Sequence, residues 1–241
     1  MFSFLTNKKN TLLSSVDIHS HLIPGIDDGS NNMETSIQLI KELKSIGYKK
    51  LITTPHVSDM FPNTTSRILE GFDQLKKEVA QQEIDIELEI SAEYYADDFF
   101  EKLLSQDDIL SFGEKKYLLF ETSYFTPPQN IFNTIHDIQL SGYTPVLAHP
   151  ERYLYWHHDF SKYHELKERG LLFQINLNSI SGYYNKEIQI VVEKLINNSL
   201  VDFVGSDTHH HTHIKKLKTS ISSSFYKKAF KKNIILNETL R

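Results

Sequence analysis

Short apolar runs alternate with longer amphipathic segments along most of the chain. The runs are rich in β-branched, leucine and aromatic residues, which is typical of buried strands. They occupy residues 15–21, 49–56, 84–95, 116–123, 143–152, 171–179 and 201–210, with a weaker eighth run at 233–238. This alternation predicts repeated βα units around a parallel sheet.

Amphipathic segments separate these runs. Their apolar residues recur at helical spacing, and several of the segments end in Gly or Asn, as helices often do. They occupy residues 33–47, 66–82, 128–142, 162–170 and 186–199. No fixed-period repeat, low-complexity tract or linker interrupts the pattern. We therefore predict a single α/β barrel domain over residues 1–241, with residues 1–15 as an N-terminal extension.

Composition narrows the possible chemistry. The chain has 241 residues and is 39% hydrophobic, which is enough for one large core. Its net charge of -5 gives no reason to expect a nucleic-acid or anionic-membrane partner. The absence of cysteine excludes disulfides, thiolate zinc sites and thiol nucleophiles. We find no transmembrane segment of ~20 apolar residues and no convincing secretion signal, so we expect a cytoplasmic protein.

Side chains that can bind metals stand at the ends of six of the seven clear runs. The carboxyl ends of barrel strands share one face, and active sites are built there. His19 and His21 would point to the same side of a strand, as would Asp207 and His209, which suits chelation of one cation. The complete set is His19, His21, His56, Glu93, Glu121, His149, Asp207 and His209.

Ordinary structural roles are open for many of these residues. His56 and His149 each neighbour a proline and would also fit loop positions. Asp27 and Asp28 would also fit as caps of the helix that begins near residue 32. We interpret three further histidines as loop residues: His210, His211 and His213. Tyr94, Tyr95, Tyr183 and Tyr184 are interpreted as core or pocket wall. A buried acid needs a partner, however, and for Glu93 and Glu121 a cation is the simplest one.

Six motifs together carry a family resemblance. The stretches "DIHSHLIPGIDDGS", "TTPH", "AEYY", "FETS", "AHPERY" and "GSDTHH" resemble the PHP (polymerase and histidinol phosphatase) superfamily. They are most similar to its bacterial capsule-associated, manganese-dependent protein-tyrosine phosphatases. The resemblance runs from about Val16 to Asn237. It implies a distorted TIM-like (β/α)7 barrel that carries a trinuclear metal site.

The resemblance also implies individual roles. A first metal would be bound by His19, His21, Glu93 and Asp207; a second by Glu93, Glu121 and His149; and a third by Asp28, His56 and His209. The nitrogen and oxygen donors suit Mn²⁺, with Fe²⁺ or Zn²⁺ as alternatives. Arg152 falls at the family's phosphate-binding arginine. A second expected basic residue has no clear counterpart, because Ile214 is followed by Lys215 and Lys216. Asn185 stands where a glycine is expected.

The function that the resemblance implies is metal-dependent hydrolysis of phosphotyrosine, with a hydroxide between two metals as nucleophile. Three divalent ions and four carboxylates leave a charge of about +2, which matches a phosphate-monoester dianion. The expected substrate is a bacterial tyrosine kinase that regulates capsular or exopolysaccharide synthesis. The alternatives are a histidinol-phosphate or other small-phosphomonoester phosphatase, an amide hydrolase and a non-catalytic domain. No residue is singled out by spacing as a general acid.

Overall fold

The computed structural model describes residues 12–241. Most of the predicted N-terminal extension, residues 1–11, lies outside this range. Its last residues pack on the C-terminal part of the chain, where the Leu13 amide donates a 2.7 Å hydrogen bond to the hydroxyl of Tyr226. The extension as a separate segment stays a prediction.

The seven clear runs all contain strands. These are β1 (Val16–Asp17), β2 (Lys50–Thr53), β3 (His56–Val57), β4 (Glu87–Ile90), β5 (Glu93–Tyr95), β6 (Tyr117–Glu121), β7 (Thr144–Ala148), β8 (Leu172–Asn176) and β9 (Phe203–Gly205). The second and third runs each form two strands. Pro55 has no N–H group for the ladder and separates β2 from β3, and the facing run is interrupted at the same level, between β4 and β5.

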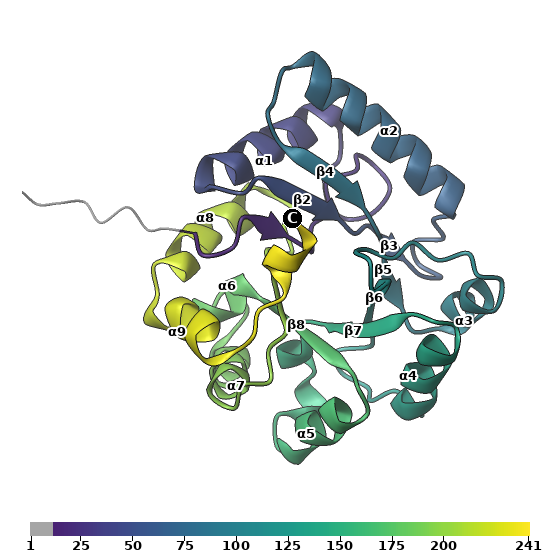
Figure 1. Ribbon diagram of the computed structural model, residues 1–241, viewed down its shortest axis with the longest axis vertical. Coiled ribbons are helices and arrows are strands. Elements are labelled where there is room, and N and C mark those ends of the chain that lie inside the picture. The colour runs from purple at the N-terminus through teal and green to yellow at the C-terminus, as the bar shows by residue number, and fades with distance from the viewer. Residues whose placement is uncertain (1–11) are drawn as a thin grey trace, which may run out of the picture.

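All strand pairs are parallel and follow the order of the runs. The sheets have the strand orders β1-β2-β4 and β3-β5-β6-β7-β8-β9. Because β2 and β3 share one run, and β4 and β5 share the next, the two sheets form one continuous wall. A parallel bridge between Ser20 and Thr208 joins the first run to the seventh. The wall therefore closes as a distorted seven-run barrel, as expected, with the strands at the centre of the molecule (Figure 1).

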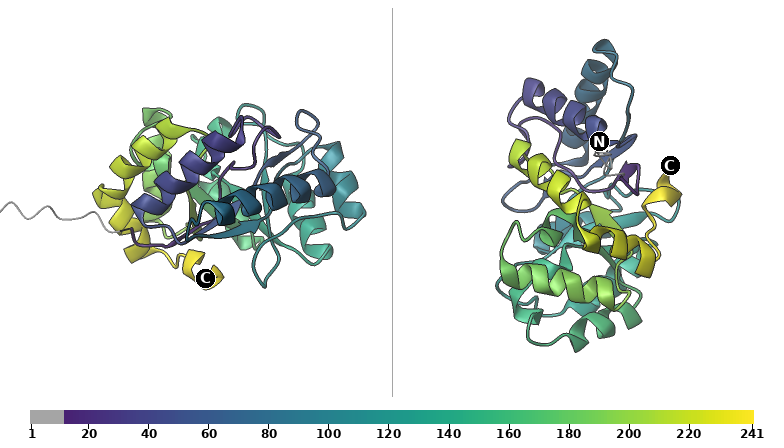
Figure 2. Two further views of the ribbon diagram at one scale, coloured as in Figure 1. Left: turned by 90° about the horizontal axis from the view of Figure 1, so that it is seen from above. Right: turned by 90° about the vertical axis from the view of Figure 1, so that its left-hand side faces the viewer.

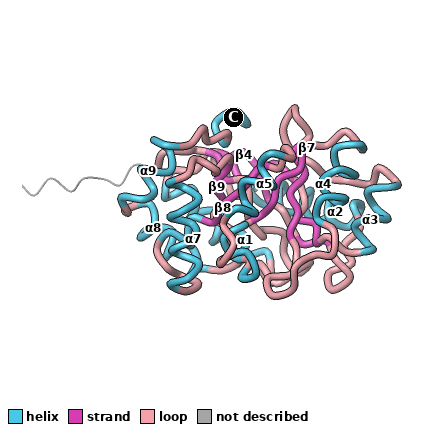
Figure 3. The backbone as a smooth tube through the Cα atoms, turned by 90° about the horizontal axis from the view of Figure 1, so that it is seen from below, coloured by secondary structure: helices cyan, strands magenta, loops and turns pink. Residues whose placement is uncertain are grey.

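Helices surround this wall. They are α1 (Met33–Ile46), α2 (Thr65–Gln81), α3 (Asp98–Ser105), α4 (Ile131–Leu140), α5 (Ser161–Glu168), α6 (Leu177–Ile180), α7 (Lys186–Asn197), α8 (His211–Ile221) and α9 (Ser224–Lys232). Short 3-10 helices are η1 (Pro150–Arg152), η2 (Leu154–Trp156) and η3 (Asn237–Leu240). The neighbouring helices α1 and α2 lie on the outside (Figure 2), and the helices enclose the strands when the molecule is seen from below (Figure 3).

Two local predictions were wrong. The eighth run at 233–238 is not a strand among the described residues and leads into η3. The side chain of Asn237 explains this, because it bonds the backbone of Val16 and Val204 at the barrel end and takes the place of a further strand. His211 and His213 lie in the first turn of α8 and are not loop residues; His210 is the N-cap of that helix.

Apolar side chains fill the barrel beneath the carboxyl ends of its strands. In β6, Tyr117 and Leu119 belong to this buried cluster together with Val146 and Ala148 of β7 and Phe203 of β9. Side chains two positions apart share one face of a strand. Glu121 therefore follows Tyr117 and Leu119 into the interior, one layer above the apolar cluster.

Candidate metal centre

Nine side chains converge at the carboxyl ends of the strands. His56, Glu93 and Glu121 lie in strands, and the others lie in the segments that follow β1, β7 and β9. The converging residues are His19, His21, Asp28, His56, Glu93, Glu121, His149, Asp207 and His209. They form four overlapping groups of facing donor atoms. Every residue for which a metal-binding role was expected is therefore in one place.

Glu93 lies at the middle of the cluster and is fully buried. Its Oε2 is 3.1 Å from His19 Nε2 and 3.5 Å from His21 Nε2. The same oxygen is 3.2 Å from His56 Nδ1, and Oε1 is 2.9 Å from His149 Nε2. One carboxylate thus faces four imidazoles and belongs to more than one group of donor atoms that could hold a cation.

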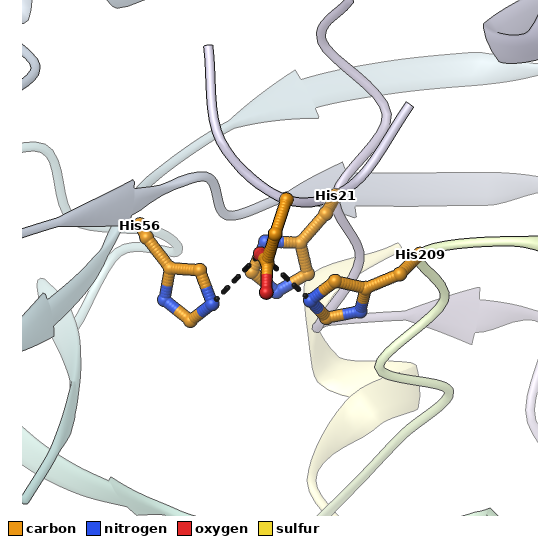
Figure 4. A group of neighbouring side chains, drawn as sticks. His21, His56 and His209 are labelled. Atoms are coloured by element: carbon orange, nitrogen blue, oxygen red, sulfur yellow. Dashed lines mark ion pairs between the residues drawn. The ribbon is translucent and has the colours of Figure 1, made fainter. Parts of the chain in front are cut away.

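A second group forms at the rim of the cluster around Asp28. Its Oδ1 lies 3.5 Å from His56 Nε2 and 3.4 Å from His209 Nε2. The rings of His21 and His209 stack with centroids 3.9 Å apart. Figure 4 shows the three histidine rings turned toward a common point. The Asp28 side chain is 59% exposed, so this group is more open to solvent than Glu93, whose side chain is fully buried.

The spacing of the donor atoms fits divalent cations. Two ligand atoms that are each ~2.1 Å from one ion lie roughly 3 to 3.5 Å apart. The separations between these nitrogens and oxygens run from 2.9 Å for His149 and Glu93 to 3.7 Å for His149 and Glu121. Two imidazole nitrogens, those of His19 and His21, approach to 3.3 Å. The donor set therefore suits several metal ions.

Neighbouring polar groups orient the imidazoles. His19 Nδ1 lies 2.7 Å from Gln174 Oε1, and His21 Nδ1 lies 2.9 Å from Asp27 Oδ2. Each contact turns Nε2 of the ring toward the cluster, which is how outer groups commonly orient histidine ligands. Gln174 is in β8, the one run without an expected ligand. No sequence signal had indicated its role.

Asp27 corrects one expectation. It does not cap α1, because Asn32 caps that helix by accepting from Thr35 N. The Asp27 carboxylate instead contacts His21 and also accepts from the amides of His56 and Gly29. Asp27 therefore fixes the His21 ring relative to the backbone of His56, while the neighbouring Asp28 faces the cluster.

Burial and charge act in opposite directions on these groups. Burial alone would lower the pKa of His19, but the carboxylates of Glu93 and Asp207 outweigh it and raise the pKa to about 9. Burial alone would raise the pKa of Glu93, yet His19 and His56 hold it well below its usual range. The low pKa of Glu93 keeps this carboxylate ionised, and without metal, protons on imidazoles such as that of His19 supply the positive charge that a cation would otherwise bring.

Two residues of the cluster have left-handed backbone. His149 has φ of 35° and Asp207 has φ of 50°. Non-glycine residues rarely adopt this region, and such strain is concentrated at functional sites. At His149 the following Pro150 restricts the backbone further. The surrounding contacts hold both side chains in the cluster despite this cost.

Arg152 lies between two aromatic rings beside the cluster. Its guanidinium carbon is 4.2 Å from the ring centroid of Tyr124 and 4.6 Å from that of Tyr184. The hydroxyl of Tyr124 donates to Glu121 Oε2 at 2.9 Å, and that of Tyr184 donates to Asp207 Oδ2 at 3.3 Å. The guanidinium also donates to Asp207 Oδ2 at 3.3 Å. The two rings thus hold the guanidinium beside the cluster. Tyr184 was predicted to lie in the core or the pocket wall, and Tyr124 was not among the predicted site residues.

A cavity of about 900 Å³ opens above these groups. Arg152 and most of the nine converging residues line it, and Tyr95, Tyr183 and Tyr184 form part of its wall, as expected. His210 and His213 also line it, which the sequence did not indicate. Lys215 and Lys216 are exposed on α8 and are not among the lining residues. Asn185, at the position where a glycine was expected, has extended backbone with φ of -171°, which any residue can adopt, and its side chain caps α7.

The comparison with protein families gives a match over residues 15–238. The matching model is described as capsular polysaccharide synthesis, CpsB/CapC. The chain belongs to this family. The tyrosine-protein phosphatase YwqE of Bacillus subtilis is 31% identical over 196 residues, which cover 81% of this chain and 77% of that protein. The tyrosine-protein phosphatase CpsB of Streptococcus pneumoniae is 30% identical, over 81% of this chain and 83% of that protein.

A solved structure extends the likeness to the whole fold. It belongs to the crystal structures of YwqE from Bacillus subtilis and CpsB from Streptococcus pneumoniae, described as unique metal-dependent tyrosine phosphatases. The TM-score is 0.82 at 27% identity, with 94% of this chain and 95% of that chain covered. None of the helices in the described part of the CpsB/CapC-family chain has the length and hydropathy needed to cross a membrane.

Proposed function

We propose that this chain hydrolyses phosphotyrosine on a protein substrate with three divalent cations, most naturally Mn²⁺, bound by the nine converging residues. It is a metal-dependent tyrosine-protein phosphatase of the CpsB/YwqE type, a phosphoric monoester hydrolase linked to capsule synthesis. The observation that carries the three-ion proposal is the set of overlapping donor groups around Glu93 and Asp28. The first ion would use His19, His21, Glu93 and Asp207; the second Glu93, Glu121 and His149; and the third Asp28, His56 and His209.

When bound, such ions make hydroxide available near neutral pH and offset charge on phosphoryl oxygens. The residues of the chain supply the rest. Glu93 and Asp207 present negative oxygens from buried positions, and Gln174 and Asp27 hold the histidine rings in place. Arg152 lies at the edge of the cavity, where its planar group can bind two phosphoryl oxygens at once.

The metal content tests this assignment directly. Elemental analysis of the purified chain is expected to find about three divalent ions per molecule. Removal of Asp28 by Asp28→Ala should lower that number by about one, because this carboxylate contacts only His56 and His209 of the rim group. An unchanged metal content in the variant would refute the role given to Asp28.

Arg152→Lys is expected to lower kcat/KM for phosphotyrosine substrates by about 10- to 150-fold, equivalent to ~1.5–3 kcal/mol. Lysine keeps the positive charge but loses the planar fork, and it cannot lie flat between Tyr124 and Tyr184. Steady-state kinetics measures the loss, and elemental analysis should show unchanged metal content. Loss of metal from the variant would instead make Arg152 a structural support of Asp207.

Substrate choice follows from the leaving group. Without an efficient general acid, the rate depends on how well the departing oxygen carries negative charge. A phenol with pKa ~10 leaves more readily than an aliphatic alkoxide. We expect phosphotyrosine peptides to be hydrolysed at least roughly tenfold faster, in kcat, than phosphoserine peptides or histidinol phosphate. Equal or faster turnover of histidinol phosphate would favour the small-phosphomonoester alternative.

The substrate that we propose is a bacterial tyrosine kinase that controls capsular or exopolysaccharide synthesis. Support comes from the family description, which concerns capsular polysaccharide synthesis. Dephosphorylation of such a kinase by the purified chain, followed with a phosphotyrosine antibody, tests the proposal. A kinase that keeps its phosphotyrosine while a small aryl phosphate is hydrolysed would separate the activity from this substrate.

A further inference from the structure

Two large apolar side chains at the mouth of the cavity are exposed. In the described part of the chain, four large apolar side chains are more than 70% exposed: Met60, Phe125, Leu140 and Ile234. Met60 is 81% exposed and Phe125 is 77% exposed, and both line the cavity above the metal centre. Single exposed apolar residues are common, but two at the mouth of the same catalytic cavity need an explanation.

The barrel order brings these residues to one side. Met60 follows β3, Tyr95 ends β5, and Phe125 lies beyond β6. These strands pair in the order β3-β5-β6 and lie side by side in Figure 1. Tyr95 therefore lies between Met60 and Phe125 in the order of the strands, while Arg152 and Tyr184 come from later runs. We call the group of Met60, Phe61, Tyr95 and Phe125 the apolar rim.

Hydrogen bonds hold the loop that carries Met60. The amide of Asp59 donates to Asp97 Oδ2 at 3.0 Å, and Asp97 Oδ1 caps α3 by accepting from the amide of Phe100 at 2.9 Å. Ser58 and Phe61 also bond each other in both directions. The loop is thus tied to the β5–α3 connection.

The turn that carries Phe125 is held in a similar way. Ser123 Oγ accepts from the amides of Phe125 and Thr126 at 3.3 and 3.2 Å. Both exposed side chains therefore stand on positioned backbone. A surface that is already ordered loses little freedom on binding, which favours its use in recognition.

Resting on the function proposed above, we propose that the apolar rim binds apolar residues beside the phosphotyrosine of an extended polypeptide substrate. The cavity of about 900 Å³ is at the upper end of ligand-site volumes and leaves room beyond one phosphotyrosyl side chain. With the phosphate at the cluster, the chain on either side of the tyrosine must cross the rim. Burial of Met60 and Phe125 by that chain removes apolar surface from water.

The test uses the double variant Met60→Ala/Phe125→Ala in the metal-loaded enzyme. Its kcat/KM for a phosphotyrosine peptide with Leu or Ile on both sides of the tyrosine is expected to fall about tenfold, mainly through KM, the scale of a lost interface contact. Its kcat/KM for p-nitrophenyl phosphate should stay within about twofold, because this substrate has no flanking residues for the rim to bind. The matched control is Leu140→Ala/Ile234→Ala, which removes equally exposed side chains outside the cavity and should change neither value.

A peptide series gives a second readout. The wild-type enzyme should prefer the apolar-flanked peptide over one flanked by Ser, and the rim variant should lose this preference. Unchanged peptide kinetics in the rim variant, or an equal loss for both substrates, would overturn the rim as a docking surface. Wild-type enzyme that cleaves p-nitrophenyl phosphate but no phosphotyrosine peptide would overturn the proposed function itself.

Discussion

Removal of the metal is expected to abolish phosphatase activity, and added Mn²⁺ should restore it. The nucleophile and the charge that binds phosphate both depend on the cations. The carboxylates of Glu93 and Asp207 are buried among imidazoles. Among the described residues, Arg152 beside them is the one side chain in contact with this group that is always positively charged. Activity on p-nitrophenyl phosphate after chelation, dialysis and readdition of Mn²⁺ measures the effect.

The melting temperature supplies a readout that is independent of activity. Protons on residues such as His19, whose pKa is raised to about 9, compensate the carboxylates when metal is absent. We therefore expect the metal-free chain to stay folded but to melt several degrees lower, since bound ions stabilise the native state by mass action. Full activity in a sample shown by elemental analysis to be metal-free would rule out metal-dependent chemistry.

Glu93→Gln is expected to lower kcat by at least about a thousandfold, equivalent to ~4 kcal/mol. The glutamine amide has nearly the shape of the carboxylate but carries no charge. Its NH2 group can only donate hydrogen bonds, so it cannot replace the second carboxylate oxygen as a metal ligand. Because Glu93 faces His19, His21, His56 and His149 at 2.9 to 3.5 Å, the substitution would weaken both of the cation positions proposed to share this carboxylate. Steady-state kinetics at saturating Mn²⁺ and elemental analysis together measure the loss.

Glu168→Gln is the matched control for this variant. Glu168 is the last residue of α5 and its side chain is exposed, so its replacement by glutamine should leave kcat and metal content unchanged. Circular dichroism should show that both variants are folded. A Glu93→Gln enzyme with turnover near that of the wild type would mean that Glu93 does not bridge cations.

The barrel and its polar end could be predicted from local sequence patterns. A few neighbouring residues are enough to indicate a strand-like run, a helical segment or a metal-binding side chain at the end of a run. The reason is that side-chain direction repeats every two residues in a strand and about every three to four residues in a helix. His19 and His21 show this, as do Asp207 and His209. The same local reasoning overpredicted a strand at 233–238, since it could not show that Asn237 bonds the barrel end through its side chain.

The sequence by itself therefore determined the barrel and the residue types at its strand ends. Only the tertiary structure decided which side chains contact and orient these residues. Asp27 and Asp28 are adjacent in sequence, yet their side chains have different partners. Asp27 contacts His21 Nδ1, on the side of the ring away from the cluster, and Asp28 faces His56 and His209. The ring stacking on Arg152 and the apolar rim likewise join segments from different runs. Such contacts arise only when different runs come together in the barrel, and no pattern within one run can encode a partner on another.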